Sequence, residues 1–258
     1  MNSYVTNILE YPRLFCVLSF VVLWASALVG VLVRKKLGPI ADDERDVFGF
    51  VQTAILTLLG LIIGFTFSMA LGRYDQRKNY EEAEANAIGT EYVRADLLPA
   101  PDAAKVRELL KTYLDQRVLF YATRDEAQLR QIDARTTKLQ NDLWSVVQAR
   151  AAVQPTQTVA LAVSGMNDVL NSQGYTQAAW WYRIPVHAWT LMTAIAIWCN
   201  LLLGYGARRT SMRLFLVVPL AVAISFYLIA DIDSPRRGTV SILPQNLMSL
   251  SQTLHPQL

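Results

Sequence analysis

The most informative stretch of the chain runs from Val47 to Gly72 and contains no charged residue. As an α-helix, at about 1.5 Å per residue, it would extend over roughly 39 Å. That length exceeds the ~30 Å hydrocarbon layer of a bilayer. The sequence therefore predicts a membrane-spanning helix. Neither a Pro nor a pair of Gly interrupts the residues that follow, so we expect the helix to continue into a soluble domain.

Small and polar residues recur every three or four positions within this stretch, a spacing that places them on one face of a helix. They are Gly49, Thr53, Thr57, Gly60, Gly64, Ser68 and Gly72. One interpretation is packing, because Gly60 and Gly64 have the GxxxG spacing that lets helices approach closely. The other is that copies of the helix line a polar path in an oligomer. The residues alone leave both interpretations open.

Three further apolar stretches are long enough to be membrane spans. Leu14 to Val33 is followed by Arg34-Lys35-Lys36, so we interpret it as an uncleaved span and not as a signal peptide. Val186 to Gly206 and Leu214 to Ala230 are the other two. Pro219 lies inside the last stretch, and a proline within a membrane helix predicts a kink.

The region between the second and third spans is polar, with apolar residues at helical spacing. We expect helices over residues 73–98, 102–123, 126–149 and 158–173. No alternating strand pattern of useful length is present, so this region should be an all-helical bundle with its own core. Trp180-Trp181-Tyr182-Arg183 at its end is typical of an interfacial aromatic belt.

These elements predict an all-α integral membrane protein. It would have four transmembrane helices and a helical soluble insert between the second and the third. We expect a first transmembrane hairpin over residues 1–72 and an insert over 73–183 that continues the second span. A second transmembrane hairpin would occupy 184–230, and a polar, partly extended C-terminal tail would occupy 231–258.

The composition agrees with a membrane protein, because 53% of the 258 residues are hydrophobic. The formal net charge of +3 is too small to suggest a nucleic-acid partner. The two cysteines lie in apolar runs, and the two histidines form no metal-ligand cluster, so we expect no metal and no cofactor. The chain also lacks a Walker loop, a nucleophile motif and a Rossmann glycine pattern, which argues against an enzyme.

The distribution of basic residues indicates the orientation in the membrane. Four spans place the insert and both termini on one side and two short loops on the other. Those loops hold Arg34, Lys35, Lys36, Arg45, Arg208, Arg209 and Arg213. Because short cytoplasmic loops are enriched in Lys and Arg, the count favours cytoplasmic loops and an external insert.

Charged residues gather where the second and fourth spans emerge on the same side. This interfacial charge cluster comprises Arg73, Asp75, Arg77, Asp231, Asp233, Arg236 and Arg237. We expect ion pairs between the residues after the second span and those after the fourth, because partly desolvated charges need partners. The cluster would then be a structural clamp between two helix ends. The alternative is a charged vestibule or a cation site at Asp231 and Asp233.

Two segments carry a family resemblance. The first contains Gly64-Phe-Thr-Phe-Ser-Met-Ala-Leu-Gly-Arg-Tyr-Asp-Gln-Arg77, and continues with Glu84-Ala-Asn-Ala-Ile-Gly-Thr-Glu-Tyr-Val-Arg-Ala-Asp-Leu-Leu-Pro99. The second is Asp231 to Gly238. Together they resemble the bacterial family of bestrophin-like domain membrane proteins. The resemblance implies a bacterial inner membrane protein, in which an external insert would be periplasmic.

The chain also resembles true bestrophins, more distantly. These are pentameric anion channels whose second helix lines a hydrophobic neck, and Gly64-Phe65 and Arg73-Tyr74 look similar to their pattern. By that resemblance Thr57, Leu61 and Phe65 would be neck positions. The pore lining would comprise Thr53, Thr57, Gly60, Leu61, Gly64, Phe65 and Ser68. The resemblance also implies a pentamer, an anion preference and, unlike the charge count, a cytoplasmic soluble domain.

Two functional hypotheses follow. The first is an oligomeric bestrophin-like channel for inorganic ions, in which the second transmembrane helix lines the pore. Its partners would be the lipid bilayer and further copies of the same chain. The second is a non-conducting membrane scaffold or sensor whose helical insert binds a partner.

Overall fold

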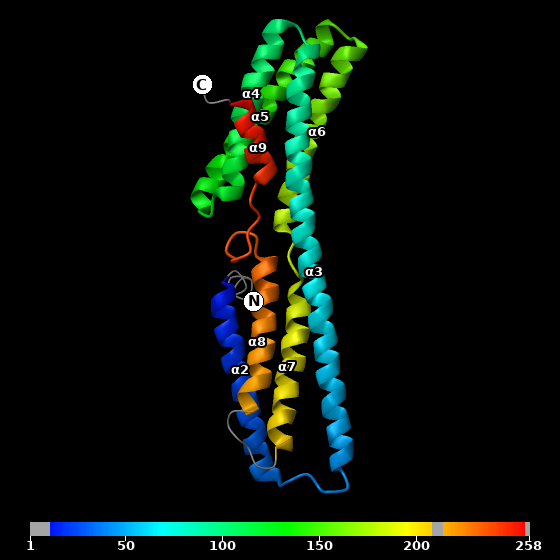
Figure 1. Ribbon diagram of the computed structural model, residues 1–258, viewed down its shortest axis with the longest axis vertical. Coiled ribbons are helices and arrows are strands. Elements are labelled where there is room, and N and C mark those ends of the chain that lie inside the picture. The colour runs from blue at the N-terminus through cyan, green and yellow to red at the C-terminus, as the bar shows by residue number, and fades with distance from the viewer. Residues whose placement is uncertain (1–10, 208–213, 256–258) are drawn as a thin grey trace. The chain divides into compact units, whose positions relative to one another are not determined.

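The computed structural model describes residues 11–207 and 214–255, and this part of the chain is all-helical, without strands (Figure 1). Its elements are α2 (Pro12–Leu37), α3 (Arg45–Arg94), the 3-10 turn η1 (Ala95–Leu97), α4 (Ala100–Ala122), α5 (Glu126–Val153), α6 (Gln157–Trp181), α7 (Val186–Gly206), α8 (Leu214–Asp233) and α9 (Gln245–Leu254). The loop residues Arg208, Arg209 and Arg213, which entered the charge count, lie outside the described residues.

The chain forms two compact units. The membrane unit comprises residues up to Tyr74 together with Arg183–Ser241, and the insert unit comprises Asp75–Tyr182 and the residues from Ile242 onward. Four helical stretches of the described residues are long and apolar enough to cross a membrane. They are Pro12–Leu37, Arg45–Leu97, Gln157–Gly206 and Phe215–Asp233.

Helix α3 is continuous from Arg45 to Arg94 and contributes residues to both units. No proline interrupts it, so the backbone hydrogen-bond ladder is maintained throughout. The helix ends in the η1 turn just before Pro99, because the residue that precedes a proline is disfavoured in helical conformation. The residues predicted to line a pore and the first residues of the insert therefore belong to one continuous helix.

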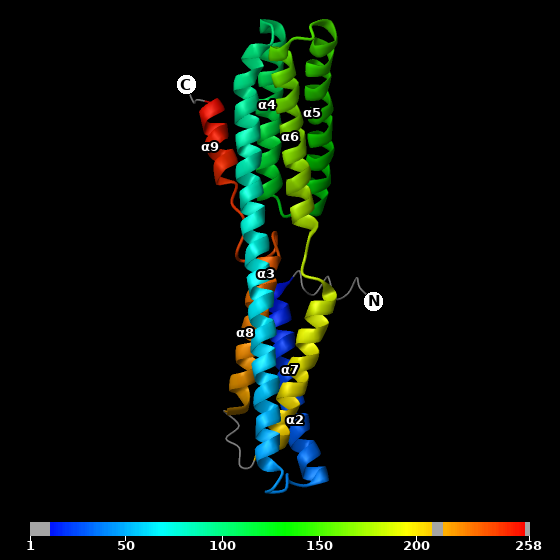
Figure 2. The same cartoon turned by 90° about the vertical axis from the view of Figure 1, so that its right-hand side faces the viewer.

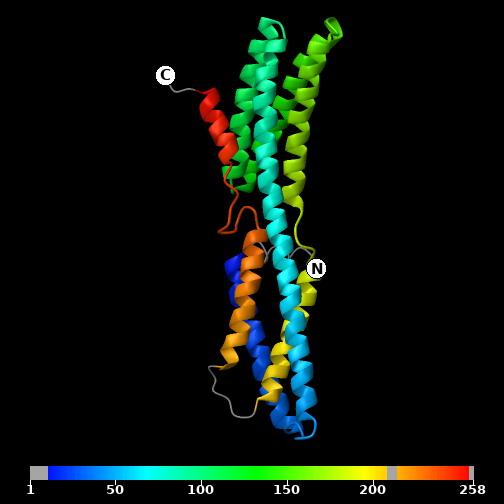
Figure 3. The same cartoon turned by 45° about the vertical axis from the view of Figure 1, so that its right-hand side comes forward.

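Two predicted helix ends were wrong, and one helix was not predicted. Helix α8 continues to Asp233, so two aspartates of the interfacial charge cluster belong to its last turn. Helix α6 continues beyond residue 173 to Trp181. The tail that we expected to be partly extended contains α9, which lies beside α3 in the insert unit (Figures 2 and 3). Leu247 of α9 is fully buried there, and apolar burial accounts for the helix.

The predicted aromatic belt is also wrong for one of its residues. Trp180 is buried, and its ring packs edge-to-face on Phe120 and Tyr121, with centroid distances of 5.2 and 5.4 Å. Such aromatic pairs contribute to core stability beyond their buried area. Trp181 and Tyr182 are exposed, as interfacial residues would be.

A close contact between α2 and α7 organises the membrane unit. A Cβ atom added at Gly30 would lie 2.1 Å from the Leu201 carbonyl oxygen, and one added at Gly204 would lie 1.9 Å from the Ala27 carbonyl oxygen. The two backbones therefore touch, as small residues at a membrane helix interface allow. Around this contact an apolar core joins α2, α3, α7 and α8 through Leu23, Leu59, Trp189, Met192 and Phe226.

A buried ion pair lies in the core of the insert unit. Arg117 of α4 donates through Nε and Nη2 to the carboxylate of Glu84 on α3, and neither side chain is exposed. Thr176 of α6 donates to the same carboxylate at 3.1 Å. Burial is the main cause that raises the pKa of Tyr121, and the charge of Glu84 raises it further, so the Tyr121 hydroxyl remains protonated. The carboxylate thus links three helices.

We predict that Gly204→Ala lowers the thermal stability of the purified protein. The new methyl group would overlap the backbone of α2, and such overpacking costs about 1–3 kcal/mol. The measurement is the midpoint of thermal unfolding in detergent.

Gly174→Ala in α6 is the matched control. A Cβ atom at Gly174 meets nothing within 4 Å, and alanine favours a helix interior by roughly 0.5–1 kcal/mol over glycine. Equal midpoints for Gly204→Ala and the wild type would refute the backbone contact.

Candidate functional site: the exposed face of α3

Helix α3 has two different faces within the membrane unit. On one face Leu59, Thr66 and Ala70 are buried, and Leu59 and Ala70 belong to the apolar core. On the opposite face Leu61 and Phe65 keep 54% and 67% of their surface exposed. The helical period of 3.6 residues accounts for this division. One face is thus used for packing within the chain, and the other is available to contact another molecule.

The exposed face contains every residue that we predicted to line a pore. Thr53, Thr57, Gly60, Leu61, Gly64, Phe65 and Ser68 are all exposed in the single chain. Cβ atoms added at Gly60 and Gly64 would meet no atom within 4 Å, in contrast to Gly30 and Gly204. Packing within the chain therefore does not account for the small residues of this stripe.

The threonines of the stripe satisfy their own donors. Thr53 donates its hydroxyl proton to the Gly49 carbonyl oxygen, and Thr57 donates to the Thr53 carbonyl oxygen, each at 2.9 Å. This bonding to the preceding turn is common for Thr in helices. It leaves hydroxyl oxygens on a face that also presents Ser68, and polar groups on a membrane helix favour contact with protein or water over lipid.

Arg77, from the interfacial charge cluster, caps the C-terminal end of α6 within the insert unit. Its side chain is buried, and its Nε and Nη2 atoms donate to the carbonyl oxygens of Ala179 and Tyr182, both at 3.0 Å. These carbonyls lie at the C-terminal end of α6, where helix carbonyls lack intrahelical partners and carry partial negative charge. The cation of Arg77 therefore supplies both the hydrogen bonds and the charge that this end needs.

The two aspartates at the end of α8 bind backbone groups of the membrane unit. Asp231 accepts from the N–H groups of Thr239 and Val240 at 2.7 and 2.9 Å, and Asp233 accepts from the Ile184 N–H at 3.0 Å. A Cβ atom at Gly238 would lie 2.2 Å from the Asp231 carbonyl oxygen, so this turn requires glycine. These contacts engage Asp231 and Asp233 with backbone groups of the turn after α8 and of Ile184, and the clamp between the second and fourth spans stays a prediction.

The other members of the cluster have different surroundings. Arg73 contacts the Met69 sulfur at 3.8 Å, Asp75 is exposed, and the Arg237 guanidinium lies 4.7 Å from the centroid of the Tyr11 ring. The predicted ion pairing of the residues after the second span with Asp231, Asp233, Arg236 and Arg237 stays a prediction.

Sequence reasoning missed the individual roles of the acidic residues that follow the second span. Glu81 accepts from the N–H of Leu247 at 2.9 Å and from the Asn246 side chain at 2.6 Å, so it caps the N-terminal end of α9. Glu84 forms the buried pair with Arg117. Their three-residue spacing, which puts both on one side of a helix, was the only indication in the sequence.

Comparison with known proteins identifies the fold. A crystal structure of a variant of a bacterial bestrophin homologue from Klebsiella pneumoniae matches with a TM-score of 0.63 and 12% identity, over 92% of this chain and 97% of that one. The same homologue in another crystal structure matches at 0.63 and 14%, over 92% and 96%. A variant of a membrane protein matches at 0.61 and 15%, over 93% and 97%. No curated protein matches the chain.

Over its described residues the protein is thus all-helical, with four helices long and apolar enough to cross a membrane, and it has the fold of bacterial bestrophin homologues. The family model of the bestrophin-like domain matches residues 19–247, which include α3, the insert helices and the turn after α8. The chain belongs to the bestrophin-like family.

We predict that Asp231→Ala loosens the turn after α8. Without the carboxylate, the N–H groups of Thr239 and Val240 lose an acceptor, and hydrogen bonds to charged groups contribute about 1.5–3 kcal/mol. Tryptic cleavage after Arg236 and Arg237 in the folded protein should accelerate by about tenfold or more, since 1.4 kcal/mol corresponds to tenfold. Mass spectrometry of the C-terminal fragment measures the rate.

Asp75→Ala removes an exposed carboxylate and is the control, with an unchanged rate expected. The role of Asp231 in holding this turn is rejected if Asp231→Ala is cleaved no faster than the wild type.

Proposed function

We propose that the protein is an oligomeric ion channel in which α3 lines the pore. The observation that carries the proposal is the exposed face of α3, which is small and polar at several positions although it belongs to a membrane-spanning helix. A lipid-facing surface gains nothing from glycine and hydroxyl groups, whereas a pore needs them for space and for water.

The order of residues along this face suggests where the pore would be narrow. Leu61 and Phe65 place large apolar side chains between the Thr53–Thr57 segment and Ser68, and apolar constrictions can gate a pore by excluding water. Thr57, Leu61 and Phe65 correspond by resemblance to the hydrophobic neck of bestrophins. We therefore propose a constriction at Leu61 and Phe65 flanked by wider polar segments.

A channel of this kind requires a closed ring of identical subunits, because one copy of α3 cannot enclose a path. A pentamer follows from the resemblance to bestrophins, as does an anion preference. In this chain Thr53 and Thr57 already donate their hydroxyl protons to the backbone. Their hydroxyl groups would have to rotate before they could donate to an anion. The charge selectivity of the channel therefore has to be measured directly.

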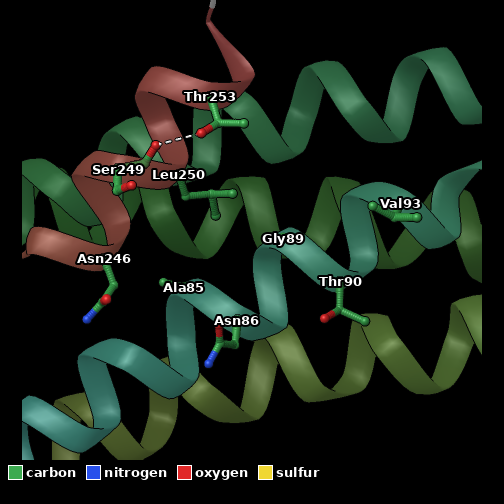
Figure 4. A pocket seen from close by; sticks show the side chains of 9 residues that line it. All are labelled: Ala85, Asn86, Gly89, Thr90, Val93, Asn246, Ser249, Leu250 and Thr253. Atoms are coloured by element: carbon green, nitrogen blue, oxygen red, sulfur yellow. Dashed lines mark hydrogen bonds between the residues drawn. The ribbon is translucent and has the colours of Figure 1, made fainter.

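One observation favours the second candidate, a scaffold or sensor whose insert binds a partner. A groove of about 470 Å³ lies between α3 and α9 in the insert unit (Figure 4). Amide and hydroxyl side chains contribute much of its lining, with Asn86 and Thr90 on one wall and Asn246, Ser249 and Thr253 on the other. Such a groove offers hydrogen bonds to a polar partner without a charge requirement.

We predict that Leu61→Ala and Phe65→Ala change conductance or gating and leave assembly intact. Removal of either side chain would widen an apolar constriction. The measurement is ion flux through protein in liposomes under a KCl gradient, with the reversal potential giving the charge selectivity.

Leu191→Ala in α7 is the matched control, because Leu191 is exposed to a similar extent, 53%, on a different helix. Unchanged currents in both α3 variants would exclude this pore position. The scaffold hypothesis predicts no flux from folded, oligomeric protein. It also predicts that Gly60→Leu disrupts assembly through the stripe.

We also propose that the protein lies in a bacterial inner membrane with its insert in the periplasm, as the count of basic residues favours. A cysteine at Ala134, exposed on α5, should then react with a membrane-impermeant maleimide added to intact spheroplasts. A cysteine at Ala41, in the short loop between α2 and α3, should react only after lysis. The reverse pattern would establish a cytoplasmic insert. Cys16 and Cys199 lie within spans, so the wild type measures the background.

A further inference from the structure

A second buried glutamate on α3 differs sharply from Glu84. Glu91 lies in the insert unit, two turns further along, and its side chain has no exposed surface. Neither of its carboxylate oxygens has a hydrogen-bond partner within the described residues. A buried carboxylate without a partner is costly in its ionised form, whereas the neutral acid is tolerated much better.

The opposite helix is shaped to admit this side chain. A Cβ atom at Gly165 of α6 would lie 2.0 Å from Glu91 Oε2 and 2.6 Å from Arg94 Nη1. Both side chains of α3 therefore lie against a position of α6 that lacks a side chain. Arg94 Nη1 is also 4.0 Å from Asp168 Oδ2, so a weak ion pair joins the two helices beside the buried acid.

The charges near Glu91 come from few elements. Burial is the main cause that raises the pKa of Glu91, to about 8; Arg94 on its own helix opposes the rise, and Asp168 on α6 adds to it. On α4, Arg107 and Lys111 lie over the ring of Tyr92, and Arg107 is also paired to Asp96. Helix α9 carries no charged residue. At neutral pH the carboxyl group is therefore mostly protonated and uncharged.

We propose that Glu91 is a proton-dependent latch between α3 and α6 in the insert unit. With its proton, the carboxyl group fits the space at Gly165 and the two helices stay packed. Without it, a charge is left in a site that offers no hydrogen bond, and the contact opens more often. This latch is a property of the insert unit and does not depend on ion conduction.

The direction of the pH effect follows from proton binding. In the opened state Glu91 would titrate near its ordinary value of 4.5, and in the packed state near 8. Between these values the packed state binds a proton that the opened state does not, so packing weakens as pH rises. The opening equilibrium should increase by up to about tenfold per pH unit in this window and level off above it.

Hydrogen exchange of the full-length protein in detergent tests the latch. Exchange of peptides covering residues 86–98 and 161–172 is compared between wild type and Glu91→Gln at pH 5.5 and pH 7.5. Because both proteins are measured at the same pH, the intrinsic pH dependence of amide exchange cancels in the ratio of wild-type to variant exchange. We expect the ratio of wild-type to variant exchange to rise at least several-fold from pH 5.5 to 7.5. Glu82→Gln, an exposed carboxyl of the same helix, should give a constant ratio.

Asp168→Asn provides an independent test, because Asp168 is largely exposed and tolerates the change. Removal of its charge lowers the pKa of Glu91, so the wild-type-to-variant exchange ratio should rise between pH 5.5 and 7.5. A merely structural Arg94–Asp168 ion pair would make the variant less protected at both pH values. The latch is refuted if neither ratio changes with pH, or if Glu82→Gln changes as much as Glu91→Gln.

Discussion

The membrane unit depends on the backbone contact between α2 and α7 at Gly30 and Gly204. The contact uses a glycine from each helix and leaves no space for a methyl group. It therefore fixes how closely α2 and α7 approach each other. Helix α3 packs on the resulting core through the buried Leu59 and Ala70 and through partly buried residues such as Ile62 and Phe67. The GxxxG pair of α3, Gly60 and Gly64, is thereby left open to another molecule or to water. The same residue type thus has two different uses within one bundle.

The insert unit shows what a buried carboxylate needs. Glu84 and Glu91 are both fully buried on α3, yet of the two only Glu84 accepts hydrogen bonds, from the Arg117 cation and from hydroxyl groups. Glu84 is therefore a cross-link between helices, and the ion pair compensates part of its desolvation cost. Glu91 is equally buried but has no hydrogen-bond partner within the described residues. One helix consequently carries, within two turns, a buried carboxylate with hydrogen-bond donors and a buried one without them.

Hydrophobic periodicity was sufficient to predict the helical fold and all four apolar spans, because lipid and core both impose strong patterns on the chain. The third span was predicted with the bounds that α7 has. The amphipathic tail helix α9 was missed because its stability comes from Leu247 and from Glu81, a residue far away in the sequence. Likewise, Arg77, Asp231 and Asp233 were recognisable as a charged group, but their backbone partners were not. Backbone acceptors and donors carry no sequence signature, so these contacts need the fold.

Arg77 and Glu81 lie one turn apart on α3, and each holds the end of a different helix. The arginine holds the C-terminal end of α6, and the glutamate holds the N-terminal end of α9. Since Leu247 of α9 follows Glu81 by 166 positions, the insert unit is assembled from segments that are made at very different times during synthesis. Its first four helices emerge long before the segment that completes their packing. Translation through α9 is therefore a condition for a complete insert unit, and a chain that stops before α9 would leave exposed the partly apolar surface that α9 covers.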